Sequence, residues 1–153
     1  MVRVSTKLLA PAAVVFDTVK KSSTLRHVTR GLMGMTGSRR FPEEWRAGDV
    51  VRPRLFFFHW IPGWRQEIRI AQVDPARRLI ESTEKGGILR RWDHRITVEP
   101  LGESECLYTD EIDVEAGLLT PLVRFAAGLF YRYRQRRWRK LVEGGLAHYP
   151  NLV

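Results

Sequence analysis

The chain has 153 residues, a length that favours one domain with one core, and its hydrophobic content of 44% and charged content of 28% are ordinary for a globular protein. No segment approaches the ~20 apolar residues of a membrane-spanning helix. The first residues lack the apolar core of a signal peptide, so we expect a cytoplasmic protein. The lone Cys106 excludes an internal disulfide, and the net charge of +9 suggests nucleic acid or an anionic membrane as possible partners.

The first third of the chain predicts one strand and two short helices. Residues 2–8 alternate apolar and polar side chains, which is typical of a β-strand. Residues 10–16, with Pro11 near the first turn, predict a short helix, and residues 22–35 contain a second one. Residues 34–41 are rich in Gly and Ser, and we interpret them as a loop.

The middle of the chain predicts a succession of antiparallel strands. Turn-forming pairs such as Pro62-Gly63 and Gly86-Gly87 separate the segments, and Pro53 favours a bulge or an edge in the first of them. Because the connections are short, a meander is the simplest topology. The predicted strands are residues 50–60, 64–73, 79–83, 88–98 and 105–114.

The end of the chain predicts one long helix. Thr120 suits the N-cap, Pro121 suits the first helical position, and Gly144-Gly145 ends the amphipathic run of residues 122–143. In a short chain, a curved antiparallel sheet wrapped around such a helix is the simplest way to bury it. At 100° per residue, the stripe that we expect to face the sheet is Leu118, Leu122, Phe125, Ala126, Leu129 and Tyr133.

The second half of this helix is strongly basic, from Arg132 to Lys140. Two interpretations remain open, namely a solvated face whose side chains extend over the sheet edge, or a patch that binds anionic headgroups or nucleic acid. We expect any headgroup or membrane-surface contact at Arg132, Arg136 and Lys140. No specific nucleic-acid partner is expected, because no zinc-ligand spacing, helix-turn-helix pattern or RNA-binding signature accompanies the charge.

The last two predicted strands place a histidine and a carboxylate on the same inward face, because their even-numbered residues are the more apolar set. The expected loop length pairs Val98 with Cys106 and His94 with Asp110 across the sheet. Three roles for the latter pair stay open: a general base with its orienting acid, a polar anchor for a ligand, or a structural pair of buried polar groups.

The chain resembles the START-like helix-grip superfamily, also called SRPBCC, which includes plant pollen allergens, lipid-transfer domains and bacterial polyketide cyclases. The resemblance rests on residues 10–16, 91–96, 108–112 and 121–143. It implies an α+β fold in which a curved antiparallel sheet of six or seven strands wraps around a long C-terminal helix, with two short helices after the first strand. It covers nearly the whole chain, which we interpret as one ligand-binding domain over residues 1–153.

The predicted function is binding, transport or sequestration of a hydrophobic or amphipathic small molecule, including lipids, in a cavity between sheet and helix. The alternative is a cyclase- or dehydratase-type enzyme that uses His94 and Asp110 in the same cavity. No catalytic residue, cofactor or metal is assigned, because the chain has no nucleophile elbow, Gly-rich phosphate loop or metal triad. The expected ligand-binding residues are Phe16, Phe57, Trp64, Trp92, His94, Tyr108, Asp110, Phe125, Leu129 and Tyr133.

Overall fold

A computed structural model of the chain describes residues 1–146, so the last part of the predicted domain, residues 147–153, lies outside the described residues. Three helices and nine strands, with two 3₁₀ turns at Ser38–Arg40 and Gly117–Leu119, make up this described part. The helices are α1 (Ala12–Val19), α2 (Ser22–Thr29) and α3 (Thr120–Glu143). The strands are β1 (Val2–Leu8), β2 (Met33–Met35), β3 (Val50–Val51), β4 (Arg54–Phe57), β5 (Ile61–Arg65), β6 (Glu67–Asp74), β7 (Leu79–Gly86), β8 (Leu89–Pro100) and β9 (Cys106–Glu115).

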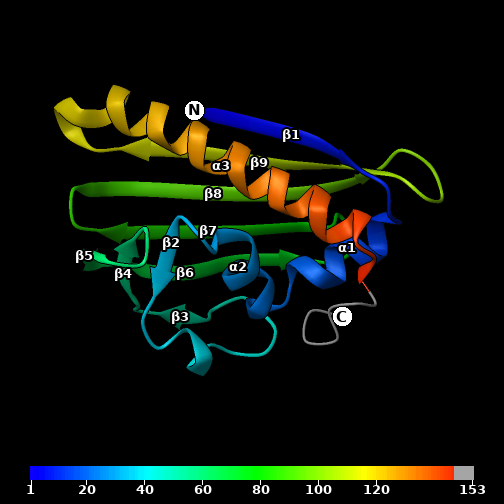
Figure 1. Cartoon of the computed structure of the whole chain (residues 1–153), viewed down its shortest axis with the longest axis horizontal. Helices are drawn as coiled ribbons and strands as arrows, with labels where there is room; N and C mark the ends of the chain where they lie inside the picture. The colour runs from blue at the N-terminus through cyan, green and yellow to red at the C-terminus, as the bar shows by residue number, and fades with distance from the viewer. Residues whose placement is uncertain (147–153) are drawn as a thin grey trace.

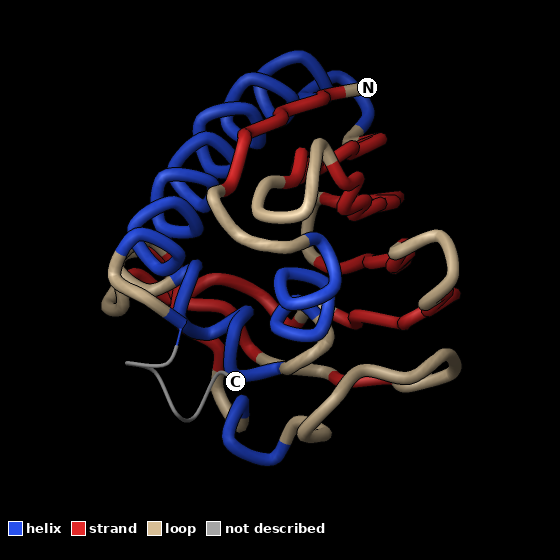
Figure 2. Tube along the Cα trace, turned by 90° about the vertical axis from the view of Figure 1, so that its right-hand side faces the viewer, coloured by secondary structure: helices blue, strands red, loops and turns tan. Residues whose placement is uncertain are grey.

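The main sheet has six antiparallel strands in the order β1-β9-β8-β7-β6-β3, and α3 crosses it diagonally (Figure 1). Seen from the end of the molecule, α3 runs along one side and most strands lie on the other (Figure 2). The consecutive strands β6 to β9 form the predicted meander, and β1 adds to the edge beside β9. The expected α+β helix-grip fold, with two short helices after the first strand, is confirmed.

A second sheet, which the sequence did not predict, has three strands in the order β2-β4-β5. The predicted strand 50–60 is divided into β3 and β4 and ends in a turn at residues 58–60, whereas the predicted turn Pro62-Gly63 lies within β5. The predicted strand 64–73 covers the end of β5 and most of β6. Pro53 separates β3 from β4, because proline has no backbone N–H for a ladder, and its carbonyl accepts from the backbone N–H of Gln66. Met33–Met35, at the junction of the predicted helical segment 22–35 and the predicted loop 34–41, pairs with β4 instead. The small sheet therefore forms a wall opposite part of the main one.

The long helix has 24 residues and ends at Glu143, as predicted, but it starts one residue earlier than the predicted cap implies. Thr120 is its first residue rather than its N-cap. The Thr120 hydroxyl donates to the Gly117 carbonyl and accepts from the Ala116 backbone N–H, so it closes the preceding 3₁₀ turn instead. Pro121 lies in the first turn, where its missing N–H costs nothing.

The expected buried stripe of α3 is wrong. Leu118, Leu122, Phe125 and Leu129 are all exposed, because the first half of the helix packs on the sheet through Val123 and Ala127 instead. Two of the buried side chains in the second half, Arg134 and Gln135, are polar. A search for apolar residues at helical spacing therefore does not detect the buried face. The buried face is Ala127, Tyr131, Arg134, Gln135, Trp138, Leu141 and Val142.

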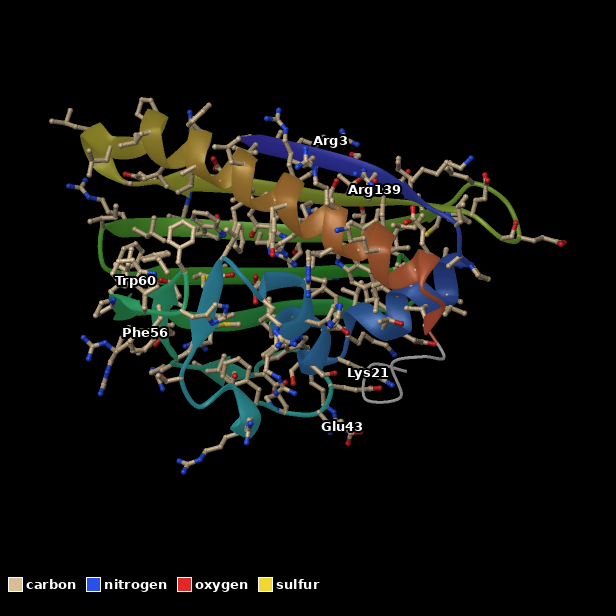
Figure 3. All side chains as sticks on the ribbon, in the orientation of Figure 1. Arg3, Lys21, Glu43, Phe56, Trp60 and Arg139 are labelled. Atoms are coloured by element: carbon tan, nitrogen blue, oxygen red, sulfur yellow. The ribbon has the colours of Figure 1, made fainter. Side chains whose placement is uncertain are left out.

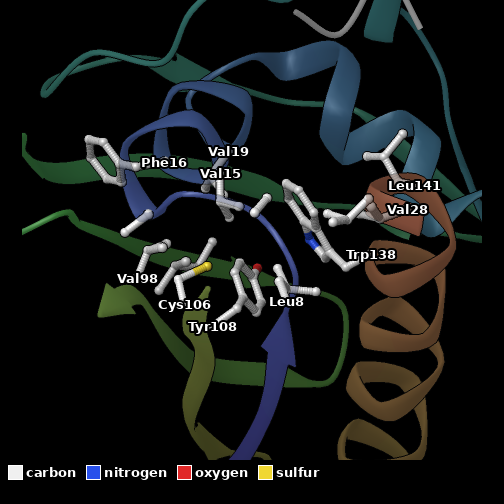
Figure 4. Packing of buried hydrophobic residues seen from close by; sticks show 14 of the residues in the cluster. Leu8, Val15, Phe16, Val19, Val28, Val98, Cys106, Tyr108, Trp138 and Leu141 are labelled. Carbon is white, nitrogen blue, oxygen red and sulfur yellow. The ribbon is translucent and has the colours of Figure 1, made fainter. Parts of the chain in front are cut away.

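The largest core cluster fills the end of the molecule where α1 and the last turns of α3 meet the sheet (Figure 4). Trp138 stacks against Tyr108 there, with ring centroids 5.2 Å apart, and Phe16 of α1 is buried in the same cluster. Cys106 is completely buried, as a small strand residue. This end is therefore packed, and some of its residues, among them Tyr108 and Trp138, also border the site described next.

Candidate ligand-binding site

A cavity of about 680 Å³ lies between α3, α2, the main sheet and the small sheet. The inward faces of β6, β7 and β8 form its floor, because alternate residues of a strand point to the same side. Helix α3 forms its roof and the small sheet closes one side. The walls are largely apolar, and their polar side chains are few: Thr24, Thr29, Gln66, Ser82, Glu84, His94, Tyr108, Tyr131 and Arg134.

The mouth of the cavity is bordered by large apolar side chains that are exposed on the surface. Leu122 and Leu129 of α3, Ile88 of the β7–β8 turn and Phe58 after β4 all line the cavity while remaining exposed. Trp60, at the β4–β5 turn, is exposed at the end of the molecule where α3 begins (Figure 3). An apolar ligand therefore meets apolar surface before it enters.

The register of β8 and β9 differs from the predicted one by two residues. His94 pairs with Ile112 and Asp110 pairs with Ile96, whereas the expected partners were His94 and Asp110 themselves. An even shift keeps every side chain on its predicted face, so both residues still point inward. They meet diagonally, and His94 Nε2 lies 2.8 Å from Asp110 Oδ1.

Asp110 is the centre of a buried polar network, at 0% exposure. Its Oδ1 accepts from His94 and, at 3.2 Å, from the Tyr108 hydroxyl. Its Oδ2 accepts at 3.1 Å from Gln135 of α3, whose amide also donates to the Val4 carbonyl. The network ties β1, β8, β9 and α3 together, and both carboxylate oxygens are occupied.

The charges around Asp110 keep it ionised. Burial by itself raises the pKa of Asp110, but Arg134 and the hydrogen bond from His94 outweigh it and lower the pKa below the usual value. An ionised carboxylate only accepts hydrogen bonds, so His94 donates through Nε2. In neutral His94, Nδ1 is then an acceptor on a side chain that lines the cavity. Burial raises the pKa of Tyr108 well above its usual value, so Tyr108 remains a neutral donor.

A second polar chain, which the sequence did not predict, runs along the opposite part of the wall. Trp64 Nε1 donates to Gln66 Oε1 at 2.8 Å, and Gln66 Nε2 donates to Glu84 Oε2 at 3.2 Å. Desolvation in the apolar cavity raises the pKa of Glu84, although His94 and the Gln66 hydrogen bond oppose the shift. The predicted strand ended at Thr83, one residue short of Glu84, yet Glu84 continues the inward alternation of Ile80 and Ser82.

Arg134 is the other polar residue that the sequence missed. We had grouped it with the exposed cations of α3, but it is only 5% exposed and lines the cavity. Its guanidinium carbon lies 4.8 Å from the centre of the Tyr131 ring. Burial alone lowers the pKa of Arg134, but Asp110, Tyr108 and Tyr131 raise it above its usual value, so the group is charged. The sequence feature that could have identified Arg134 as buried is its spacing from Tyr131 and Trp138, which places the three residues on one face of the helix.

The expected ligand-binding residues divide into two groups. Phe57, Trp64, Trp92, His94, Tyr108 and Leu129 line the cavity, and Asp110 lies behind the wall, where it holds His94. The remaining three lie elsewhere: Phe16 in the core, Phe125 at 66% exposure on the outside of α3, and Tyr133 against the α2–β2 loop.

Tyr133 lies away from the cavity because its hydroxyl donates to the Arg30 carbonyl at 2.6 Å. Gly31, with a positive φ of 100°, allows this approach, since a side chain there would collide with the phenol oxygen. Tyr133 therefore fastens α3 to the loop after α2. Sequence periodicity cannot detect such a contact, because the two residues are about a hundred positions apart.

The fold is that of solved START-like proteins. A START superfamily protein from Mycobacterium smegmatis superposes with a TM-score of 0.68 at 18% identity, over 94% of this chain and 97% of that one. One domain of the di-domain ARO/CYC protein BexL, from the BE-7585A biosynthetic pathway, superposes with a TM-score of 0.71 at 15% identity, over 92% of this chain and 45% of that one. Norcoclaurine synthase from Thalictrum flavum gives a TM-score of 0.55 at 15% identity, over 85% and 83% of the two chains.

These similarities show the fold, which is the START-like helix-grip fold. Residues 6–142 match the family model described as "Domain of unknown function (DUF8410)", and the chain belongs to that family. No curated protein matches the sequence significantly. In the described residues, no helix combines the length and apolarity required to span a membrane.

Proposed function

We propose that this protein binds a hydrophobic or amphipathic small molecule in the cavity between the main sheet and α3. The observation that carries the proposal is the cavity itself, whose volume of about 680 Å³ lies within the usual range for small-molecule sites. Its wall is apolar with a few converging polar groups, the combination that buries a ligand and orients it. From such a site we infer a role in transport or sequestration of the ligand. We propose that one ligand-binding domain performs this role in the cytoplasm.

The neighbouring structures support the same class of ligand. The norcoclaurine synthase structure is described as a complex with dopamine and hydroxybenzaldehyde, and BexL is described as an ARO/CYC protein of a biosynthetic pathway. Small aromatic molecules are therefore reasonable candidates beside lipids. The aromatic wall formed by Phe57, Trp64 and Trp92 suits either type, because flat rings offer large apolar contact areas.

Filling the cavity tests the proposal. Ala126 lines the cavity from α3 and is itself exposed, so Ala126→Trp should fold and obstruct the mouth. We expect the wild type to bind the neutral dye N-phenyl-1-naphthylamine, with a rise in fluorescence, and Ala126→Trp to weaken binding at least about tenfold, or about 1.4 kcal/mol.

The matched control is Phe125→Trp, one residue along the helix and off the cavity wall, which should bind the dye as the wild type does. Equal dye binding by Ala126→Trp and the wild type, or no binding by either, would contradict the proposal. If the wild type binds the dye as expected, a lipid-extract mass spectrum of natively purified protein would identify the bound molecule.

An enzyme of the cyclase or dehydratase type is a second candidate, favoured by one observation. His94 is hydrogen-bonded to an ionised carboxylate and lines the cavity, the arrangement of a general base with its orienting acid. A structural role predicts that His94→Ala lowers the free energy of unfolding by roughly 1–3 kcal/mol, because Asp110 loses a buried donor. A catalytic role predicts a smaller loss of stability and no turnover of a substrate that still binds. Denaturant unfolding, together with product analysis on polyketide-like substrates, distinguishes the two.

A further inference from the structure

We propose that Arg134 is an anion-binding subsite within the cavity, and that the ligand is an amphipathic molecule bearing a carboxylate. The inference rests on the proposed function and adds the chemical class of the ligand's polar end. It concerns a side chain inside the cavity, and it is separate from the exposed cations of α3.

The first observation is that Arg134 is buried and that its Nε has no hydrogen-bond partner. Its Nε is inaccessible to solvent and lacks an acceptor, and the residue forms no ion pair with any carboxylate of the described part of the chain. The stacking contact is with the Tyr131 ring, which supports the flat guanidinium group but accepts no strong hydrogen bond from it. A charged group without acceptors is costly to bury, so an acceptor from outside the chain stabilises this arrangement.

The second observation is that the nearby carboxylates are already used. Both oxygens of Asp110 accept hydrogen bonds, from His94, Tyr108 and Gln135. Glu84 accepts from Gln66, and its raised pKa reflects the apolar surroundings. The charge of Asp110 offsets that of Arg134 at a distance, but Nε of the guanidinium group stays without an acceptor.

The shape of the site decides which anion fits. A guanidinium group presents parallel N–H donors that match a carboxylate or a phosphate. One arginine balances the single charge of a carboxylate, whereas a doubly charged phosphate would leave an uncompensated charge in an apolar cavity. Arg134 is twelve residues after Leu122 on the same helix, roughly 18 Å at 1.5 Å per residue. Leu122 borders the mouth, so a ligand with its carboxylate on Arg134 extends its apolar part along α3 towards the exposed rim.

The test uses ligands that differ only in the polar end. The aliphatic pair is dodecanoate and dodecanol, and the aromatic pair is 2-naphthoate and 2-naphthol. The affinity of each compound is measured by its competition with N-phenyl-1-naphthylamine. We expect the wild type to bind at least one carboxylate about 10- to 100-fold more tightly than its alcohol, the effect of a charge-assisted hydrogen bond. The pair with the larger preference shows whether the ligand is of the fatty-acid or the aromatic-acid type.

Arg134→Met should reduce the ratio of acid to alcohol affinity to about one, and Arg134→Lys should retain only part of the preference, because lysine lacks the planar fork. The matched control is Arg124→Met, which removes one exposed charge from α3 beside Asp113 and should keep the preference. The preference should persist in about 0.5 M salt, where exposed charges are screened.

Equal binding of acids and alcohols by the wild type, or a preference that Arg134→Met and Arg134→Lys both retain, would overturn the subsite. Dye binding that survives in that case leaves the proposed function standing. Failure of the wild type to bind the dye and every ligand would instead overturn the proposed function itself. If Arg134→Met does not fold, the wild-type ligand pairs and Arg134→Lys decide.

Discussion

At the scale of single residues, the buried Asp110 and the partly buried Glu84 are two carboxyl groups in one site whose pKa values shift in opposite directions. Asp110 has Arg134 and three hydrogen-bond donors around it, and these stabilise its charge. Glu84 has Gln66 and a largely apolar wall, so desolvation dominates. The two pKa values differ because of the surroundings of the carboxyl groups and not because of the residue types. Each pKa shift has a measurable consequence for the free energy of unfolding.

Asp110 should stabilise the protein at neutral pH and lose that contribution in acid. Because its pKa in the folded protein is below the usual value of 3.8, the unfolded chain binds the proton more tightly. The free energy of unfolding should therefore fall as the pH drops from about 4 through the folded pKa. Asp110→Asn should cost about 1–3 kcal/mol at neutral pH and flatten this acid limb in urea titrations. An unchanged acid limb in the variant would contradict this assignment.

Glu84 should have the opposite effect. Its folded pKa is raised above the usual value of 4.5, so the folded protein binds the proton more tightly than the unfolded chain. The stability that neutral Glu84 contributes is complete below pH 4.5 and is lost as the pH rises through the folded pKa. Glu84→Gln, which keeps an acceptor for Gln66, should raise the free energy of unfolding at neutral pH and change it little in acid. Glu81→Gln, on the outward face of β7, is the control.

At the scale of elements, α3 has two different halves. The second half is packed through Tyr131, Trp138 and Leu141, and it carries the buried polar pair Arg134-Gln135. Arg137 donates to the His27 carbonyl, and Arg139 (labelled in Figure 3) donates to the Thr6 hydroxyl. Both contacts fit the interpretation of side chains that extend over neighbouring elements. The first half covers the cavity with its apolar side chains exposed. One helix thus closes the core and forms the roof of the site.

Three cations of α3, Arg132, Arg136 and Lys140, are exposed and remain candidates for contact with anionic headgroups. If they bind a membrane surface, flotation with anionic vesicles should weaken at high salt, since exposed charges are screened over about 8–10 Å near physiological ionic strength. Changing all three to Ser should abolish that salt dependence and leave the far-UV CD spectrum unchanged. Vesicle binding that is insensitive to salt and to the triple variant, or tight binding to one nucleic-acid sequence, would contradict this proposal.

At the scale of the whole molecule, one end is a packed core and the other is hollow. The core gathers Leu8, Val15, Val98 and Trp138 from four elements (Figure 4), whereas the cavity lies under α3 between Leu122 and Trp138. The ordering of strands, the faces of β8 and β9 and the length of α3 were predicted from the sequence, because these depend on local periodicity and turn residues. The small sheet was not predicted from the sequence, because β2 and β4 are short segments without a clear alternation of apolar and polar residues.

The same division holds for the site. Local alternation alone identified the inward faces that carry His94, Tyr108 and Asp110, and a register error of two residues did not affect it. The roles of Arg134 and Glu84 depended on the tertiary structure, since the helix crossing and the curvature of the sheet decide which charged residues become buried. The sequence by itself determined the periodic elements and their inward faces, which follow from contacts a few residues apart. Only the tertiary structure decided which face of α3 is buried and where the hollow lies, because these depend on packing between distant segments.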